Sequence, residues 1–263
     1  MRHAPLLFAA VAITGASFAA CGVTPGRAIA VTFTAEGALP DFETAAGWRV
    51  HLTQAWMSIG PIYVLAPAAQ TARLDRLRAL VLPIARAHGG HDDFAALAVR
   101  AEWLDERVVD LLGGPVVLGE GDGSAGQAES TTVELAVPAD TAGPTRGHVA
   151  WVAGVATPLA GGAEVAFEGG LDVAPDTIGS AVESVASAFA MDASGTLALS
   201  IHADGRGGAA PSWLEQAHFD RLPLPATGTV RSLAPGTQPY VAWYLAARDA
   251  AAFRTAYAPG AEP

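Results

Sequence analysis

This chain of 263 residues has almost no cysteine and no lysine. Cys21 is its only cysteine, so no disulfide can form within the chain, and a packed core has to hold the fold. Removal of residues 1–20 leaves 14 arginines against 26 aspartates and glutamates, a net charge of −12. A surface of this sign repels nucleic acid and anionic lipid, which excludes both as partners of the folded part.

The apolar run near the N-terminus is too short for a permanent membrane-spanning helix. It extends from Leu6 to Ala20 without an ionisable group, and its 15 residues fall below the roughly 20 that a spanning helix needs. Arg2 precedes the run and small residues end it. This order of charge, apolar run and small residues is typical of a cleaved secretory signal, so we predict a signal peptide at residues 1–20.

The residues Phe18-Ala19-Ala20-Cys21 resemble a bacterial lipobox. The resemblance implies that Cys21 is acylated, with palmitate or a similar chain, and becomes the mature N-terminus on a membrane. It also implies the outer membrane, because Gly22 stands where aspartate often retains such lipoproteins in the inner membrane. The chain is thus similar to uncharacterised exported bacterial lipoproteins over Met1 to Cys21, which implies a cell-envelope location but no catalytic residue. The alternative is an ordinary signal followed by a spare cysteine.

Alternating apolar and polar residues predict strands in much of the remaining chain. The clearest examples are residues 29–34, 47–53, 131–137 and 196–202. We therefore predict an all-β fold, an antiparallel β-sandwich of eight to twelve strands, as a single domain at 29–263 that follows a tether at 21–28. Strand-like segments outnumber credible helices, which disfavours a doubly wound α/β fold.

Several segments have patterns of their own. Residues 67–93 predict a loop or short-helix excursion from the sheet, and residues 239–257 a short helix before a final strand. Two hairpins are expected, one through a glycine-rich turn at 119–126 and one through residues 159–162. The turn at 119–126 matches G-x-G-x-x-G, but a strand follows it instead of a helix, which argues against dinucleotide binding. A calcium site there lacks the expected carboxylate at its twelfth position, so a solvated acidic turn is favoured.

Histidines and carboxylates are densest at residues 87–93. His88 and His91 stand three residues apart, with Asp92 beside them, and could turn toward one ion. Imidazole ligands suit zinc or copper, and we expect distant ligands from His51 and Met57, which have equal parity on one strand. The other distant options are His148, His202 and His218. The alternative is a polar loop that binds no metal.

The six tryptophans could line a ligand-binding face, but their places in or beside apolar strands favour the core. No nucleophile, base and oxyanion site converge in the pattern, which favours a non-catalytic binding or structural lipoprotein with a protein or small-molecule partner. A metal-dependent hydrolytic enzyme of the cell envelope remains the alternative.

Overall fold

A computed structural model describes residues 26–37, 40–67, 99–173, 181–203 and 212–260. These residues form fourteen strands, one α-helix and short 3₁₀ segments. The predicted all-β class and the short C-terminal helix are confirmed, although the strands outnumber the eight to twelve expected. The signal peptide, Cys21 and nearly all of the predicted excursion at 67–93 lie outside the described residues.

The larger sheet, which we call sheet A, has eight strands. In spatial order they are β11 (Ala181–Met191), β8 (Gly126–Glu134), β4 (Ile62–Leu65), β5 (Val99–Trp103), β7 (Val116–Ser124), β1 (Ala28–Glu36), β12 (Gly195–Ile201) and β14 (Phe253–Pro259). β1 pairs in parallel with β12, whereas its other neighbour, β7, is antiparallel. The sheet is therefore mixed, with a parallel β1–β12 pair that the predicted antiparallel sandwich did not include.

Sheet A curls until its two edge strands meet. The Thr255 hydroxyl of β14 donates to the Ala186 carbonyl of β11 at 3.2 Å, and Ser187 Oγ lies 2.5 Å from Thr255 Oγ1. Ser187 Oγ also lies 2.7 Å from Thr131 Oγ1 of β8. We call this contact between β11 and β14 the seam. Because β11 has two register irregularities, which bend a strand, it can turn toward β14. Side chains thus join the two edges of the sheet.

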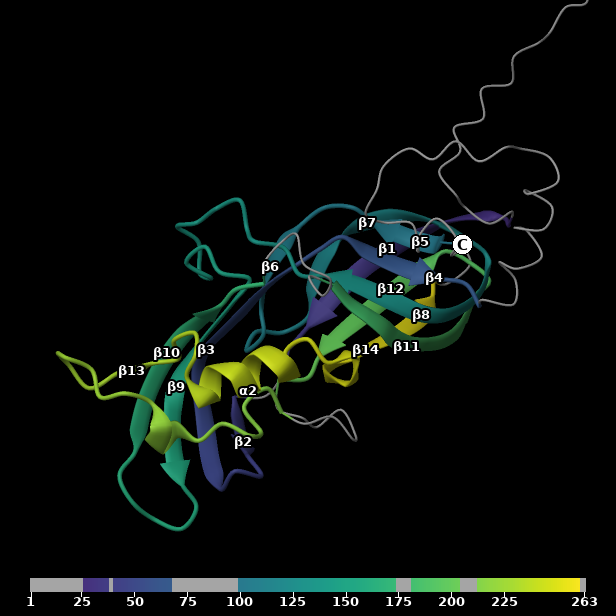
Figure 1. The fold of residues 1–263 in the computed structure, drawn as a ribbon. Coiled ribbons are helices and arrows are strands. Elements are labelled where there is room, and N and C mark those ends of the chain that lie inside the picture. The colour runs from purple at the N-terminus through teal and green to yellow at the C-terminus, as the bar shows by residue number, and fades with distance from the viewer. Residues whose placement is uncertain (1–25, 38–39, 68–98, 174–180, 204–211, 261–263) are drawn as a thin grey trace, which may run out of the picture.

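The smaller sheet, sheet B, lies at the other end of the molecule (Figure 1). Its order is β13 (Arg231–Ser232), β10 (Val165–Leu171), β9 (Ala150–Pro158), β3 (Trp48–Ile59) and β2 (Asp41–Glu43), and β6 (Arg107–Asp110) also pairs with β3. The β9–β10 pair is the hairpin expected through residues 159–162. β3 connects the sheets, since β4 of sheet A follows it after a cis peptide bond between Gly60 and Pro61.

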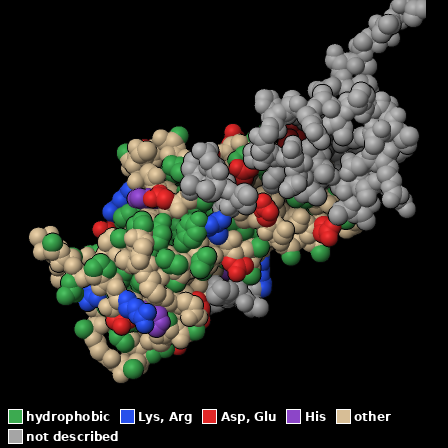
Figure 2. All heavy atoms as spheres, viewed as in Figure 1, with side chains coloured by type: hydrophobic (Ala, Val, Ile, Leu, Met, Phe, Trp, Pro, Cys, Tyr) green, Lys and Arg blue, Asp and Glu red, His purple; other side chains and the backbone are tan. Residues whose placement is uncertain are grey.

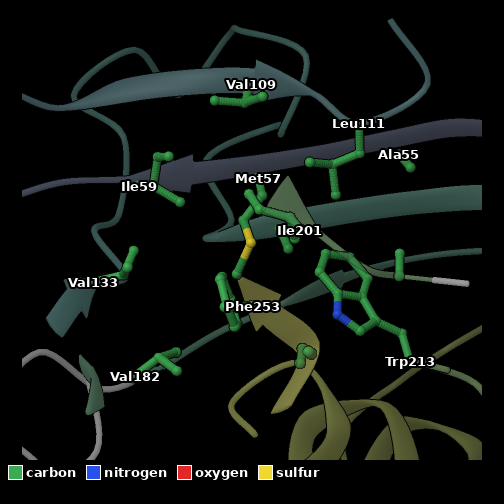
Figure 3. Close-up of a cluster of buried hydrophobic side chains, with 14 of the residues drawn as sticks. Ala55, Met57, Ile59, Val109, Leu111, Val133, Val182, Ile201, Trp213 and Phe253 are labelled. Carbon is green, nitrogen blue, oxygen red and sulfur yellow. The ribbon is translucent and has the colours of Figure 1, made fainter. Parts of the chain in front are cut away.

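One hydrophobic core extends across both sheets. Every second side chain of a strand enters this core. Val31 and Phe33 of β1 and Leu197 and Leu199 of β12 are all fully buried, while their neighbours face outward. Figure 3 shows its centre, where Ala55, Met57 and Ile59 of β3 lie among Val109, Leu111, Ile201, Trp213 and Phe253. With these apolar side chains removed from water, hydrophobic burial is the main contribution to stability.

Helix α2 (Gln238–Ala246) covers part of this core. The Thr237 hydroxyl caps it by accepting a hydrogen bond from the Tyr240 amide at 3.4 Å. Tyr240 and Trp243 face inward, while Val241 and Leu245 remain exposed, and hydrophobic side chains gather over α2 on the face in Figure 2. No helix within the described ranges is long and apolar enough to cross a membrane.

The predicted hairpin through the glycine-rich turn is wrong. Residues 119–124 belong to β7, and the β4–β5 pair separates β7 from β8. Two glycines of the motif allow close packing, since a Cβ on Gly121 would lie 2.1 Å from the Glu102 carbonyl oxygen and one on Gly126 would lie 2.6 Å from the Arg100 guanidinium. Buried Arg100 donates to the carbonyls of Gln127 and Ala125, at 3.2 and 3.3 Å, and burial lowers its pKa. The motif is therefore a packing feature and not a phosphate-binding loop.

Candidate binding face

A β-bulge in β3 decides which of its side chains share a face. Leu52 pairs with Gly154 and Gln54 with Ala153, so Thr53 is an extra residue. Thr53 and Gln54 are both exposed, and the inward positions change from even numbers before the bulge to odd numbers after it. Regular alternation along the sequence would assign β3 as one unbroken strand and would not predict this bulge.

The bulge overturns the prediction that His51 and Met57 share a face. The His51 side chain is 54% exposed and lies 2.8 Å from Asp41, whereas Met57 is fully buried in the core (Figure 3). His88, His91 and Asp92 lie outside the described residues. Among the residues that are described, no three His, Cys, Asp or Glu side chains gather as they would around a metal ion. Zinc or copper binding at His88 and His91 thus stays a prediction, without Met57 as a partner of His51.

Trp56 instead shares the outer face of sheet B with His51. His51 pairs with Val155 of β9, and Trp56 pairs with Trp151 of the same strand. Residues 151 and 155 have the same parity on a strand without a bulge, so both point away from the core. We define the polar face as this outward side of β2, β3, β9 and β10, together with Arg146 and His148 from the loop before β9 and Asp172 just after β10.

Two pairs of basic and acidic side chains lie at one end of the polar face. Arg49 Nη2 lies 2.8 Å from Glu43 Oε1, and His51 Nδ1 lies 2.8 Å from Asp41 Oδ1. Each pair links directly opposed residues of β2 and β3, where side chains on one face come into contact. All four side chains are more than half exposed, so they are accessible to a ligand in solvent.

The opposite end of the polar face is built around Trp151. The Arg146 guanidinium carbon lies 3.9 Å from the centre of the indole ring and Arg146 Nη1 lies 3.4 Å from Glu168 Oε2. Arg146 has a left-handed backbone, with φ of 55°, and this uncommon conformation accompanies its placement over the ring. His148 stacks on Trp151 with 5.8 Å between ring centroids. Trp151 is therefore only 7% exposed although it points away from the core.

His148 is held in place from two sides. Its Nδ1 lies 2.8 Å from Asp172 Oδ1, and its ring crosses Gly170, where a Cβ would lie 2.1 Å from the ring Cδ2. Only glycine therefore permits this approach. The Asp172 amide donates to the Tyr240 hydroxyl of α2 at 3.4 Å, and burial raises the pKa of the Tyr240 phenol. Tyr240 thus contacts the backbone of the residue whose carboxylate lies against His148.

The remaining predicted residues are dispersed. His202, a distant metal option, donates its backbone amide to the Ala252 carbonyl, and its partly buried ring has a buried Nε2 that no described residue hydrogen-bonds. The backbone amide of His218, another option, donates to Gln238 Oε1. Four tryptophans, Trp48, Trp103, Trp213 and Trp243, belong to the core as predicted. Trp56 and Trp151 do not, and the sequence contains no signal of the bulge that turns Trp56 outward.

Comparison with known proteins does not assign this chain to a family. No protein-family model, curated protein or solved structure matches this chain. The all-β class therefore rests on the structure alone, and a proposal for function rests on the chemistry of the polar face.

Proposed function

We propose that this chain is a lipid-anchored protein of the bacterial cell envelope that binds a ligand on the polar face without catalysing a reaction. The observation that carries the proposal is the gathering of four carboxylates, two paired with arginines and two with histidines, beside two tryptophans on one exposed sheet face. Exposed pairs of basic and acidic side chains contribute only about 0–1 kcal/mol to stability, so a role in folding does not account for four of them on one face.

The position of the polar face fits an anchored protein. β1 begins beside the turn between β7 and β8, since the Ala125 amide donates to the Arg27 carbonyl at 2.8 Å. Sheet B lies at the opposite end of the molecule (Figure 1). If acylated Cys21 holds the chain on the membrane, the short tether places the start of β1 near the lipid. The polar face then points toward ligands beyond the membrane surface.

Mass spectrometry tests the anchor. Protein purified from the membrane fraction should begin at Cys21 and carry the mass of its acyl chains, and Cys21→Ser should abolish that increment. A wild-type protein recovered in the soluble fraction with a free thiol would refute the anchor. Outer-membrane placement is tested by density separation of the two membranes of a diderm host.

Carboxyl labelling on intact cells tests the binding face. Carbodiimide with glycine ethyl ester modifies exposed carboxylates, and peptide mass spectrometry reports the extent of modification at each site. We expect Asp41 and Glu43 to be less modified on cells than in the purified protein. Exposed carboxylates elsewhere, at Glu183 and Asp249, serve as matched controls. Equal changes at both sets would show that nothing occupies the polar face.

A further inference from the structure

We propose that the polar face binds a neutral, hydroxyl-rich ligand, a glycan chain that extends along β3 from the pairs at Arg49 and His51 to Trp56. This inference rests on the proposed binding function and names the chemical class of the ligand. It follows from three properties of the face: each of its basic side chains has a carboxylate partner, its polar groups lie in rows, and an aromatic ring stands at one end.

The pairing of every arginine and histidine of the polar face with a carboxylate disfavours an anionic ligand. Arg49, His51, Arg146 and His148 each have a carboxylate partner, at 2.8, 2.8, 3.4 and 2.8 Å respectively. An anion would have to compete with these carboxylates in a protein whose net charge is already strongly negative. A metal cation would find no group of three suitable side chains in the part of the chain that the structure describes. A neutral ligand meets neither obstacle.

The paired groups suit hydroxyls. Each pair presents donors on its basic side chain and acceptors on its carboxylate, and a sugar hydroxyl both donates and accepts. Arg49 and Glu43 hold each other in place, as do His51 and Asp41, so less side-chain freedom is lost when a ligand binds. The Thr157 hydroxyl, opposite Arg49 on β9, donates to Glu164 at 3.4 Å and extends the row.

The length of the polar face suits a chain of sugar rings. Arg49 and Trp56 lie on β3 about 20 Å apart, at a rise of roughly 3.3 Å per residue. A ligand that contacts both must therefore be extended, as a chain of linked sugars is. Between the charged ends the face presents small residues, Ala153, Val155 and Ala166, which leave room for a flat ligand.

Trp56 supplies an apolar surface. It is partly exposed and opposes Trp151, whose ring the Arg146 guanidinium covers. The C–H side of a sugar ring can pack on an exposed indole, which offers a large rigid contact area. Polar groups that fix orientation beside an aromatic surface are the usual composition of small-molecule sites. The arrangement therefore combines both kinds of contact that a neutral glycan needs.

Affinity electrophoresis of the mature protein in non-ionic detergent tests the inference. The acidic protein migrates in native gels, and the probes are soluble neutral polysaccharides, namely a β-glucan, a xylan, a mannan and a dextran, with alginate as an anionic comparison. We expect at least one neutral polysaccharide to retard the protein and alginate to have no effect. Trp56→Ala should reduce the retardation coefficient about tenfold, as should Arg49→Ala.

The choice of variants separates binding from folding. Arg49 is highly exposed, so Arg49→Ala should leave the thermal melt unchanged even if Trp56→Ala lowers it. Leu245→Ala, an exposed change on α2, is the matched control and should leave the retardation unchanged.

Each remaining outcome overturns the inference. These outcomes are no retardation by any neutral probe, retardation by alginate alone, or retardation that both face variants preserve. If labelling on cells still protects Asp41 and Glu43, the binding function stands and only the glycan assignment fails. Equal labelling on cells together with no retardation overturns both.

Discussion

Ser187 at the seam gives the sharpest test of how sheet A is closed. Its hydroxyl lies within hydrogen-bond distance of Thr131 Oγ1, Thr255 Oγ1 and the Val185 carbonyl oxygen, at 2.7, 2.5 and 3.0 Å. Ser187 and Thr131 are both buried. Ser187→Ala removes these contacts and leaves the Thr131 hydroxyl buried without a partner.

The magnitude follows from the two parts of this loss. A neutral hydrogen bond contributes a net of about 1 kcal/mol, and an unsatisfied buried hydroxyl costs about 1–3 kcal/mol. We therefore expect Ser187→Ala to lower the free energy of unfolding by about 2–4 kcal/mol. Thr131→Val keeps the side-chain shape and leaves Ser187 its other contacts, so it should cost only about 1 kcal/mol.

The double variant decides between this account and simple loss of packing. In Ser187→Ala the Thr131 hydroxyl is already unsatisfied, so adding Thr131→Val should restore stability instead of lowering it further. The expected coupling energy is about 2 kcal/mol. Urea unfolding of residues 22–263, followed by tryptophan fluorescence, measures all four proteins. Additive losses would refute the hydrogen-bonded seam.

Two further predictions concern pH and metal. Burial raises the pKa of the Tyr63, Tyr240 and Tyr257 phenols, so their contribution to stability is complete below the unfolded value of about 10 and is lost as pH rises through the higher folded values. Urea midpoints should fall as pH rises above about 10, less steeply for Tyr240→Phe, and an unchanged slope would contradict this. For the predicted metal site, zinc or copper(II) should raise the melting temperature with the logarithm of metal concentration, and the gain should fade below about pH 6.5. Combined His88→Ala and His91→Ala should abolish the shift while Met57→Leu preserves it, and an equal shift in the double variant would end the hypothesis.

The sequence predicted individual strands better than their partners. Alternation identified β1, the first half of β3 and β12, because their burial follows the local period of two. It did not reveal that β1 lies parallel to β12, since residues about 164 positions apart form that pair. It also suggested a β7–β8 hairpin, although the β4–β5 pair lies between those strands. Pairing depends on the whole topology, which local periodicity does not contain.

The candidate site was harder to predict because single residues determine it. The extra residue at Thr53 moves Met57 into the core and Trp56 onto the polar face, and no composition rule marks that position. Arg146 covers Trp151 from a left-handed backbone conformation, which Gly147 continues with φ of 81°. The Arg146-Gly147 dipeptide is a local signal that could have indicated a turn there, but not the indole beneath it.

The double pairing of β1 has a mechanical consequence for a protein held by its N-terminus. A force applied through the proposed tether enters at Arg27 and acts along β1. β12 pairs with residues 31–36 of that strand and β7 with residues 28–35. Bonds perpendicular to a strand that is pulled along its length share the load, so they must shear together instead of opening one by one. A ligand that pulls on sheet B would therefore load β1 along its length, where its hydrogen bonds to β7 and β12 resist the force together.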